Sequence, residues 1–134
     1  MIGDNTMNGN VMELKWIAKM FAIGIRIFKA SSFYNHKGAD AIVYKYTDVY
    51  KLQIKQHVCS FSMSGWLDAN AKVNKYRENG VHHVVIIEPD KYFNEDLARL
   101  LNHIEDINAA WLKTHIIQEP EFIRIYKETI NSRP

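Results

Sequence analysis

The sequence predicts an α/β fold in which helices flank a central mixed sheet. Three observations predict it. Apolar residues recur at helical spacing after residue 10. Two runs rich in Val, Ile and Tyr, residues 40–46 and 49–55, follow each other closely and predict a β-hairpin. The near-continuous apolar run over residues 81–87 is typical of a strand that is covered on both faces.

Length and composition favour one domain. The chain has 134 residues and a formal net charge of +2, which is too small to demand a nucleic-acid partner and does not oppose one. A single cysteine, Cys59, excludes an intramolecular disulfide and favours a reducing, cytoplasmic setting in which Cys59 is a buried small hydrophobe. With no leader pattern and no apolar run of about 20 residues, we expect no membrane partner.

We expect residues 1–10, which are polar and rich in Gly and Asn, to form a loose start to the chain. A helix then begins near Val11 and ends at Gly24, before a short β-like stretch over residues 25–28. The predicted core stripe of this helix consists of Leu14, Ile17, Ala18 and Phe21.

Side chains alternate along the second strand of the hairpin, so Gln53 and Lys55 point to one face and Leu52 and Ile54 to the other. Asp40 opens the first strand. If the register sets Asp40 opposite the end of the second strand, its carboxylate and the Gln53 oxygen can share Mg²⁺, with Lys55 beside a phosphate. Phosphodiester hydrolysis needs a deprotonated water and positive charge at the transition state, which such a site supplies.

Two segments near the hairpin carry candidate nucleic-acid contacts. We interpret residues 31–38 as a connecting loop in which His36 and Lys37 either contact DNA or are simply solvated. A helix over residues 67–79, ended by Gly80, has a basic side that lies along a phosphate backbone or forms a solvated face. This side consists of Lys72, Lys75 and Arg77.

The last third of the chain predicts a strand followed by helices. In the strand over residues 81–87, His82 and His83 point to opposite faces, which favours structural roles over a shared metal. One helix is expected over residues 95–111, with Asn94 as its cap, and another over residues 121–131 after a break. No repeat or linker divides the chain, so we predict one domain over residues 1–134 with residues 94–134 as C-terminal helices.

On these residues the chain resembles the PD-(D/E)xK, or restriction-endonuclease-like, nuclease superfamily, and within it the Mrr-type endonucleases and the archaeal-type Holliday junction resolvases. Asp40 after Gly38-Ala39 matches the first acid, and Gln53-Ile54-Lys55 matches the (E/Q)xK half. The run that starts at Gly9 and ends at Glu13 matches a Gly-x-x-x-Glu opening on the first helix. Two features depart from the pattern: no Pro precedes Asp40, and Gln53 replaces the commoner Glu and removes one negative charge.

The resemblance implies an α-β-β-β-α-β core and a metal-dependent endonuclease that hydrolyses DNA, duplex or branched, with Mg²⁺ or Mn²⁺ as its cofactor. Asp40 is then the principal metal ligand, Gln53 a ligand or water-positioning group, and Lys55 a water activator or transition-state stabiliser. Glu13 is an outer carboxylate that orients a water or completes the metal's shell. The resemblance also implies a homodimer, for which the apolar faces of the last two helices are available.

Other functions remain open at this point. Gln53 favours a catalytically weak or inactive DNA-binding protein on the same fold, and a test of metal binding would distinguish it from an active nuclease. Parallel digests of RNA and DNA would distinguish an RNA-cleaving nuclease from one that cleaves DNA. An unrelated α/β binding domain with a chance Gln-x-Lys predicts that Asp40 and Lys55 tolerate replacement by alanine.

Overall fold

Five strands form one mixed sheet in the order β1-β2-β3-β4-β5. The computed structural model describes residues 2–127, apart from the side chains of residues 2–10 and of His36. β1, β2 and β3 pair antiparallel, whereas β4 and β5 run parallel to β3, which confirms the predicted mixed sheet. The strands are β1 (Ile27–Lys29), β2 (Ala41–Lys45), β3 (Asp48–Lys55), β4 (His83–Ile86) and β5 (Ile116–Gln118).

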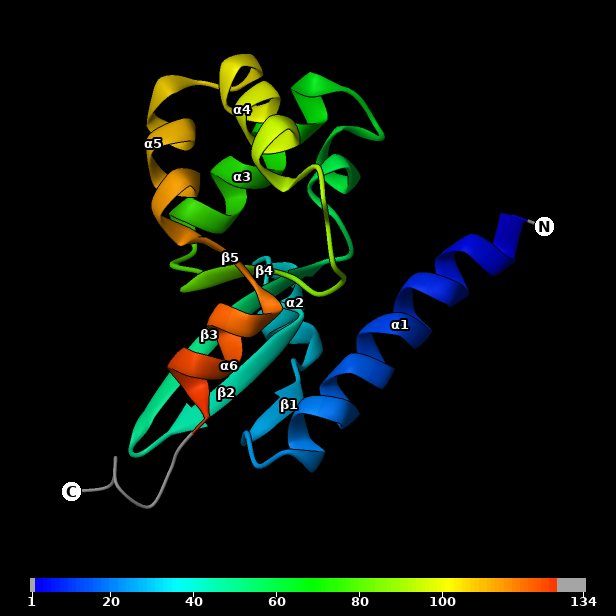
Figure 1. The fold of residues 1–134 in the computed structure, drawn as a ribbon, viewed down its shortest axis with the longest axis vertical. Helices are drawn as coiled ribbons and strands as arrows, with labels where there is room; N and C mark the ends of the chain where they lie inside the picture. The colour runs from blue at the N-terminus through cyan, green and yellow to red at the C-terminus, as the bar shows by residue number, and fades with distance from the viewer. Residues whose placement is uncertain (1, 128–134) are drawn as a thin grey trace.

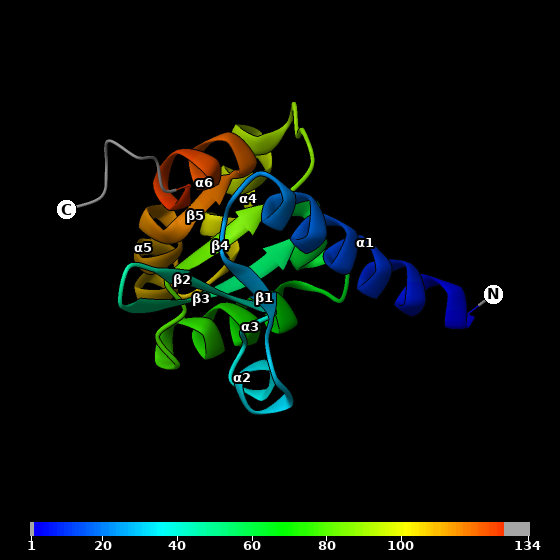
Figure 2. The same ribbon diagram turned by 90° about the horizontal axis from the view of Figure 1, so that it is seen from below.

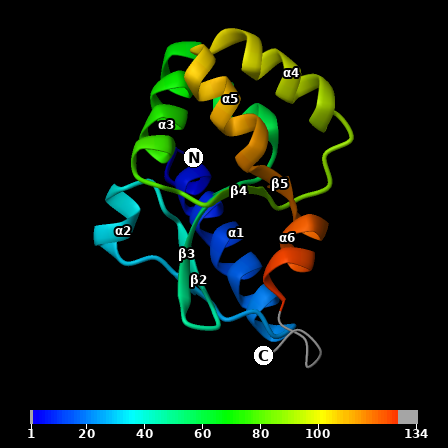
Figure 3. The ribbon, with the colours of Figure 1, turned by 90° about the vertical axis from the view of Figure 1, so that its left-hand side faces the viewer.

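Helices cover both faces of the sheet (Figures 1 and 2). α1 and α6 pack on one face, and α3, α4 and α5 form a layer on the other, seen together at the top of Figure 3. The helices are α1 (Ile2–Ala22), α2 (Ser32–His36), the 3₁₀ helix η1 (Val58–Ser62), α3 (Trp66–Glu78), α4 (Phe93–His103), α5 (Asp106–His115) and α6 (Glu119–Tyr126). Among the described residues, no helix is long and apolar enough to cross a membrane.

The apolar core has two parts, one on each face of the sheet. Beneath α1 and α6 the main buried side chains are Trp16, Ile17, Met20, Leu52, Ile54, Phe122 and Tyr126. Beneath α3, α4 and α5 they are Phe61, Val73, Tyr76, Val84, Ile86, Leu100 and Leu112. The alternation predicted for β3 is therefore real, because Leu52 and Ile54 belong to the first part.

α1 packs through a different stripe from the predicted one. Trp16, Ile17 and Met20 are buried, whereas Leu14 and Phe21 are 45% and 55% exposed. The helix is apolar on more than one side, so spacing alone did not decide which side meets the sheet. It also begins at Ile2, well before the predicted start at Val11, and its predicted end at Gly24 is confirmed by a left-handed φ of +104° there.

The predicted hairpin is confirmed, with the turn one residue earlier than expected. Asp48 already pairs with Lys45, so the turn residues are Tyr46 and Thr47, and Tyr46 adopts a left-handed φ of +55°. The predicted helix over residues 67–79 corresponds to α3. The predicted loop over residues 31–38 instead contains the short helix α2.

Gly38 links α2 to the hairpin and has no room for a side chain. Its φ is +85°, and a methyl group there would lie 2.7 Å from Cδ1 of the buried Tyr76 ring. We expect Gly38→Ala to lower the free energy of unfolding by about 2–4 kcal/mol, from backbone strain plus overpacking. Gly65 also has a positive φ, +100°, but nothing lies within 4 Å of a methyl group there.

Gly65→Ala is therefore the matched control for Gly38→Ala. We expect it to lose only the strain of its own backbone conformation, about 1–3 kcal/mol, because no neighbouring atom would be overpacked. Urea unfolding of both variants at one temperature measures the difference. Equal losses would show that the contact with Tyr76 does not constrain Gly38.

The C-terminal third differs most from the prediction. The helix expected over residues 95–111 is interrupted at Ile104 and Glu105, which have extended backbones, so α4 and α5 are separate. Asn94 lies inside α4 and does not cap it. The break has a physical reason, since Ile104 is buried and the Glu105 N–H donates to Asn70 Oδ1 at 2.8 Å. β5 was not predicted, and residues 128–131 of the last expected helix lie outside the described residues.

Burial bears on two further expectations. Much of the apolar faces of the helices predicted over residues 95–111 and 121–131 packs inside the protomer, where Leu100, Phe122 and Tyr126 are buried, whereas Ile107 is 57% exposed. Cys59 is exposed and not a buried hydrophobe. It lies in η1, whose buried side chains are Val58 and Phe61.

Candidate active site

Asp40 lies at the end of the sheet where β2 begins and β3 ends. Its N–H donates to the Leu52 carbonyl at 2.7 Å, and its Oδ2 accepts the N–H of Ile54 at 3.0 Å. The structure therefore sets Asp40 beside the strand segment that carries Gln53 and Lys55, as the predicted register required. The Asn35 amide approaches the other carboxylate oxygen at 3.5 Å.

Gln53 and Lys55 project from the face of β3 that α3 covers. In the parallel ladder they pair with Val84 and Ile86, whose side chains belong to that layer of the core. Gln53 is only 7% exposed, and its Nε2 donates to the Ile54 carbonyl at 3.2 Å. Lys55 places its Nζ 5.2 Å from the centre of the Phe61 ring, which is a cation–π contact.

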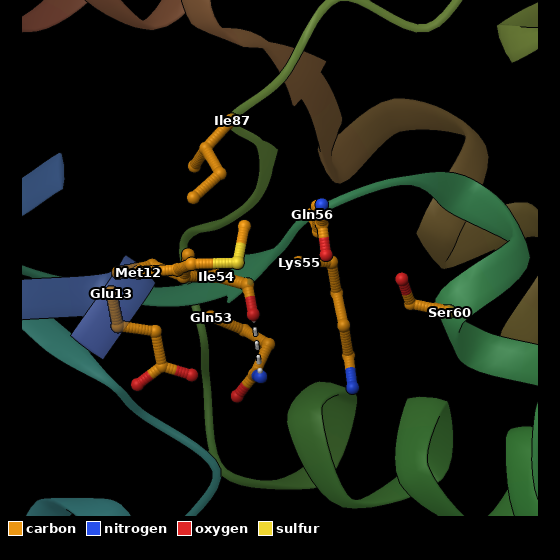
Figure 4. Close-up of a pocket in the computed structure, with 8 residues that line it drawn as sticks. All are labelled: Met12, Glu13, Gln53, Ile54, Lys55, Gln56, Ser60 and Ile87. Carbon is orange, nitrogen blue, oxygen red and sulfur yellow. Dashed lines mark hydrogen bonds between the residues drawn. The ribbon is translucent and has the colours of Figure 1, made fainter. Parts of the chain in front are cut away.

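Glu13 reaches the same place from α1. It lies one turn before Trp16 and Ile17, on the buried side of the helix. Glu13, Gln53 and Lys55 line one pocket and point their end groups to the same side (Figure 4). The other lining residues are Met12, Ile54, Gln56, Ser60 and Ile87. Asp40 lies beside this pocket and outside its lining.

The charged groups of the site influence one another. Burial raises the pKa of Glu13 to about 7, and the negative charge of Asp40 adds to this, while Lys55 and Lys29 oppose it. Burial also raises the pKa of Asp40, against the hydrogen bond from Ile54 and the charges of Lys55 and Lys75. Burial lowers the pKa of Lys55, and Lys72 adds to this, against Asp40 and Glu13. Two carboxylates and one ammonium group thus share a partly desolvated site, which is typical of functional sites.

Glu13 makes folding stability pH-dependent. Its pKa rises from 4.5 to about 7 on folding, so the folded protein binds more protons than the unfolded chain between these values. Stability conferred by the protonated carboxyl is full below about pH 4.5 and is lost as the pH rises through about 7. Solvent screens this half-buried group, and we expect the loss to be about 1–2 kcal/mol.

Glu13→Gln should remove this loss in the metal-free protein. We expect the variant to be more stable than the wild type at about pH 8 and no more stable at about pH 4. Urea unfolding at both pH values measures it, with Glu105→Gln, at an exposed position on α5's N-terminal side, as the control. A Glu13→Gln variant with the wild-type pH profile contradicts the prediction.

The oxygen atoms of the site fit a hard cation. Among the described residues, no group of three or more His, Cys, Asp or Glu is placed to hold a metal ion. The donors here are instead two carboxylates, from Glu13 and Asp40, and the amide oxygen of Gln53. Mg²⁺ uses few protein ligands and keeps waters or phosphate oxygens in its shell, so this set suits it. The charges of Lys29, Lys55 and Lys75 offset the desolvation of the two carboxylates only in part, because both pKa values stay raised, and a cation would add to this compensation.

His83, the first residue of β4, and His82, the residue before it, both have structural partners. His82 Nδ1 accepts the backbone N–H of Lys51 at 2.9 Å, and His83 Nδ1 is 2.6 Å from the Tyr126 hydroxyl. Both rings are thereby held in place. This agrees with the structural roles that the alternation of the strand favoured.

The basic residues that were predicted to contact nucleic acid differ in their surroundings. Lys75 is exposed on α3 beside Gly38, whereas Lys72 forms an ion pair with Asp68 at 2.9 Å. Arg77 hydrogen bonds to Asn108 and Asn74, inside the contacts of α3 with α5. Lys37 lies over the exposed Phe33 ring at 4.2 Å, and the His36 side chain lies outside the described residues.

Sequence reasoning missed Lys29 and Asn35. Lys29 ends β1 and influences Glu13, and Asn35 approaches Asp40. The signal for Lys29 was its position at the end of a short apolar stretch, but only the pairing of β1 with β2 brings it to the site. Asn35 had no signal beyond its polar character. Ser60, which lines the pocket, opens the Ser-rich link over residues 60–65, whose hydroxyls are candidates for phosphate contacts from the sequence alone.

Known proteins supply no family for this site. No family model, no characterised protein and no solved structure matches the chain. The resemblance to the PD-(D/E)xK superfamily therefore stays a prediction from the sequence. The residues of the site are themselves the evidence about function.

Proposed function

We propose that this protein is a metal-dependent nuclease that hydrolyses DNA phosphodiester bonds. One observation carries the proposal: α1, the start of β2 and the end of β3 bring Glu13, Asp40, Gln53 and Lys55 to one place. The carboxylates suit a divalent cation, and the ammonium group suits a phosphate. Their convergence favours a reaction that needs both.

Each residue has a chemical role in this proposal. Glu13, Asp40 and the Gln53 oxygen would hold Mg²⁺, which would polarise the phosphate and acidify a water when bound. Lys55 places positive charge where the pentavalent transition state gathers negative charge. Glu13, where it does not ligate the metal itself, is placed at the pocket to take the proton of the attacking water. The water oxygen forms a new bond to phosphorus, the ester P–O bond breaks, and the leaving alkoxide takes up a proton.

The order of elements supports the restriction-endonuclease-like core as the finer description of the fold. Apart from the short α2 and η1, the chain runs α1, β1, β2, β3, α3, β4, which is the α-β-β-β-α-β order. The site occupies the junction of the first helix with the hairpin, as the resemblance implies. The proposed substrate is duplex or branched DNA. The proposed assembly is a homodimer.

A non-catalytic DNA-binding protein is the second candidate, and Gln53 favours it. The buried amide leaves the site with one negative charge fewer than a site with Glu at this position. Calorimetric titration with Mg²⁺ separates the two functions. Binding that is lost in Asp40→Asn supports the nuclease, and no binding supports the second candidate.

A substrate panel tests the nuclease directly. Labelled supercoiled, linear, branched and single-stranded DNA, and RNA, are incubated with Mg²⁺, with Mn²⁺ and with EDTA. We expect DNA cleavage that requires either metal, with branched DNA cut fastest if the enzyme is structure-selective. Cleavage of RNA alone would make RNA, not DNA, the substrate of the nuclease. Binding without cleavage would favour the non-catalytic DNA-binding protein.

A further inference from the structure

Lys29 is held beside the site by the pairing of the first two strands. It pairs with Ala41, the residue that follows Asp40, and the next N–H, of Ala30, donates to the Asp40 carbonyl at 3.0 Å. Two residues before it, Ile27 is buried beneath α1, so Lys29 projects toward the same face of the sheet. Its charge acts on Glu13, the carboxylate that α1 brings to this face.

Lys75 approaches from the opposite face of the sheet. It lies on α3, which packs in the layer across the sheet from α1 (Figure 2). Its stem is close to the turn before Asp40, since a methyl group on Gly38 would lie 3.8 Å from Lys75 Cγ. Its charge acts on Asp40. The two lysines therefore lie on either side of the two carboxylates.

Both lysines are exposed, and neither has a hydrogen-bond or ion-pair partner for its side chain within residues 11–127 as described. Other cations near the site are already engaged. Lys72 is paired with Asp68 at 2.9 Å, and Lys55 lies inside the pocket. Lys29 and Lys75 are thus two exposed cations at the edge of the site, among the residues that the structure describes, that remain available for an anion.

We infer that Lys29 and Lys75 bind the phosphates on either side of the one that is cleaved, so that the site takes an internal bond of a continuous strand. This inference rests on the proposed function and specifies its substrate. A DNA strand that crosses the end of the sheet from β1 to α3 first meets Lys29. It then meets the carboxylates of Glu13 and Asp40 together with Lys55, and finally Lys75. A small phosphodiester with a single phosphate meets only the central groups.

The test compares DNA binding with hydrolysis of a small diester. We measure DNA affinity by fluorescence anisotropy in EDTA over a range of salt concentrations, for the wild type, Lys29→Ala, Lys75→Ala and the double variant. Lys113→Ala, at an exposed position near the end of α5, is the matched control. Hydrolysis of bis(4-nitrophenyl) phosphate is measured for the same proteins with Mg²⁺ or Mn²⁺.

We expect each single variant to bind DNA about five- to tenfold more weakly at about 0.1 M salt, whatever its base sequence. The slope of log affinity against log salt should fall by about one in each single variant and by about two in the double variant. Lys113→Ala should bind normally. Lys29→Ala and Lys75→Ala should lose less small-diester hydrolysis than DNA affinity, because the two lysines reach the central groups only through their charge.

The outcomes separate the inference from the proposed function. Wild-type salt slopes in Lys29→Ala or in Lys75→Ala overturn the two-sided contact, even if the protein hydrolyses both substrates. An equal loss of small-diester hydrolysis also overturns it, because the lysine would then act on the central phosphate. A wild-type protein that hydrolyses neither substrate with any of the metals overturns the proposed nuclease itself.

Discussion

Lys55→Met is expected to lower the rate of metal-dependent DNA cleavage by about 10²–10³-fold, the usual effect of removing one preorganised charge from a transition state. Methionine keeps an unbranched stem against the Phe61 ring, which the Lys55 side chain now covers. The change also removes a partly buried charge whose desolvation lowers its pKa. We therefore expect the variant to remain folded, with its thermal unfolding close to that of the wild type.

The measurement is the initial rate of nicking of supercoiled DNA under identical metal and salt conditions. Lys113→Met, exposed near the end of α5, is the control for removing a lysine from the surface. A Lys55→Met protein that is folded and cleaves at the wild-type rate would remove Lys55 from the mechanism.

Phe122→Ala is expected to lower the free energy of unfolding by about 3–5 kcal/mol, the range for deleting a large buried aromatic side chain. Phe122 is 0% exposed, and its ring centre lies 5.0 Å from that of Trp16 and 4.9 Å from that of Tyr126. It joins α6 to α1 beneath the sheet. Because Trp16 is one turn from Glu13, this contact also supports the helix that carries a site carboxylate.

Urea unfolding monitored by circular dichroism measures the loss. Phe33→Ala, in which the replaced ring is 61% exposed, is the matched control and should change stability by less than about 1 kcal/mol. Similar values for the two variants would mean that α6 does not contribute to the core on the α1 side.

The hairpin and the grouping of its polar residues were predictable from the sequence. Strand alternation has a fixed period of two, so Gln53 and Lys55 had to share a face once residues 49–55 formed a strand. The position of Asp40 beside them followed from the short turn, which leaves little freedom in the register. The predicted turn needed a shift of one residue, which moves the strand pairing by two, because Tyr46 accepts a left-handed backbone.

The orientation of α1 was not predictable in the same way. Leu14, Ala18 and Phe21 satisfy a helical apolar spacing, and so do Trp16, Ile17 and Met20. Only packing against the sheet selects the second stripe. The selection matters for the site, because it turns Glu13 toward the pocket.

The break between α4 and α5 and the strand β5 were missed for a related reason. Residues 104 and 105 contain neither Gly nor Pro, and their extended backbone depends on a tertiary hydrogen bond that the Glu105 N–H donates to Asn70 Oδ1. β5 has three residues between two helices, too few to show a strand period, and it exists through pairing with β4.

The central claim, that carboxylates at this site hold a metal for phosphodiester hydrolysis, is tested most directly by plasmid nicking with Mg²⁺ and with EDTA, comparing the wild type with Asp40→Asn. Asparagine keeps an oxygen to accept the Ile54 N–H and loses the charge, and Asp48→Asn, at the far end of the hairpin, is the control. We predict nicking by the wild type and by Asp48→Asn with Mg²⁺ only, and none by Asp40→Asn. Nicking by the wild type in EDTA, or full activity of Asp40→Asn with Mg²⁺, would contradict the claim.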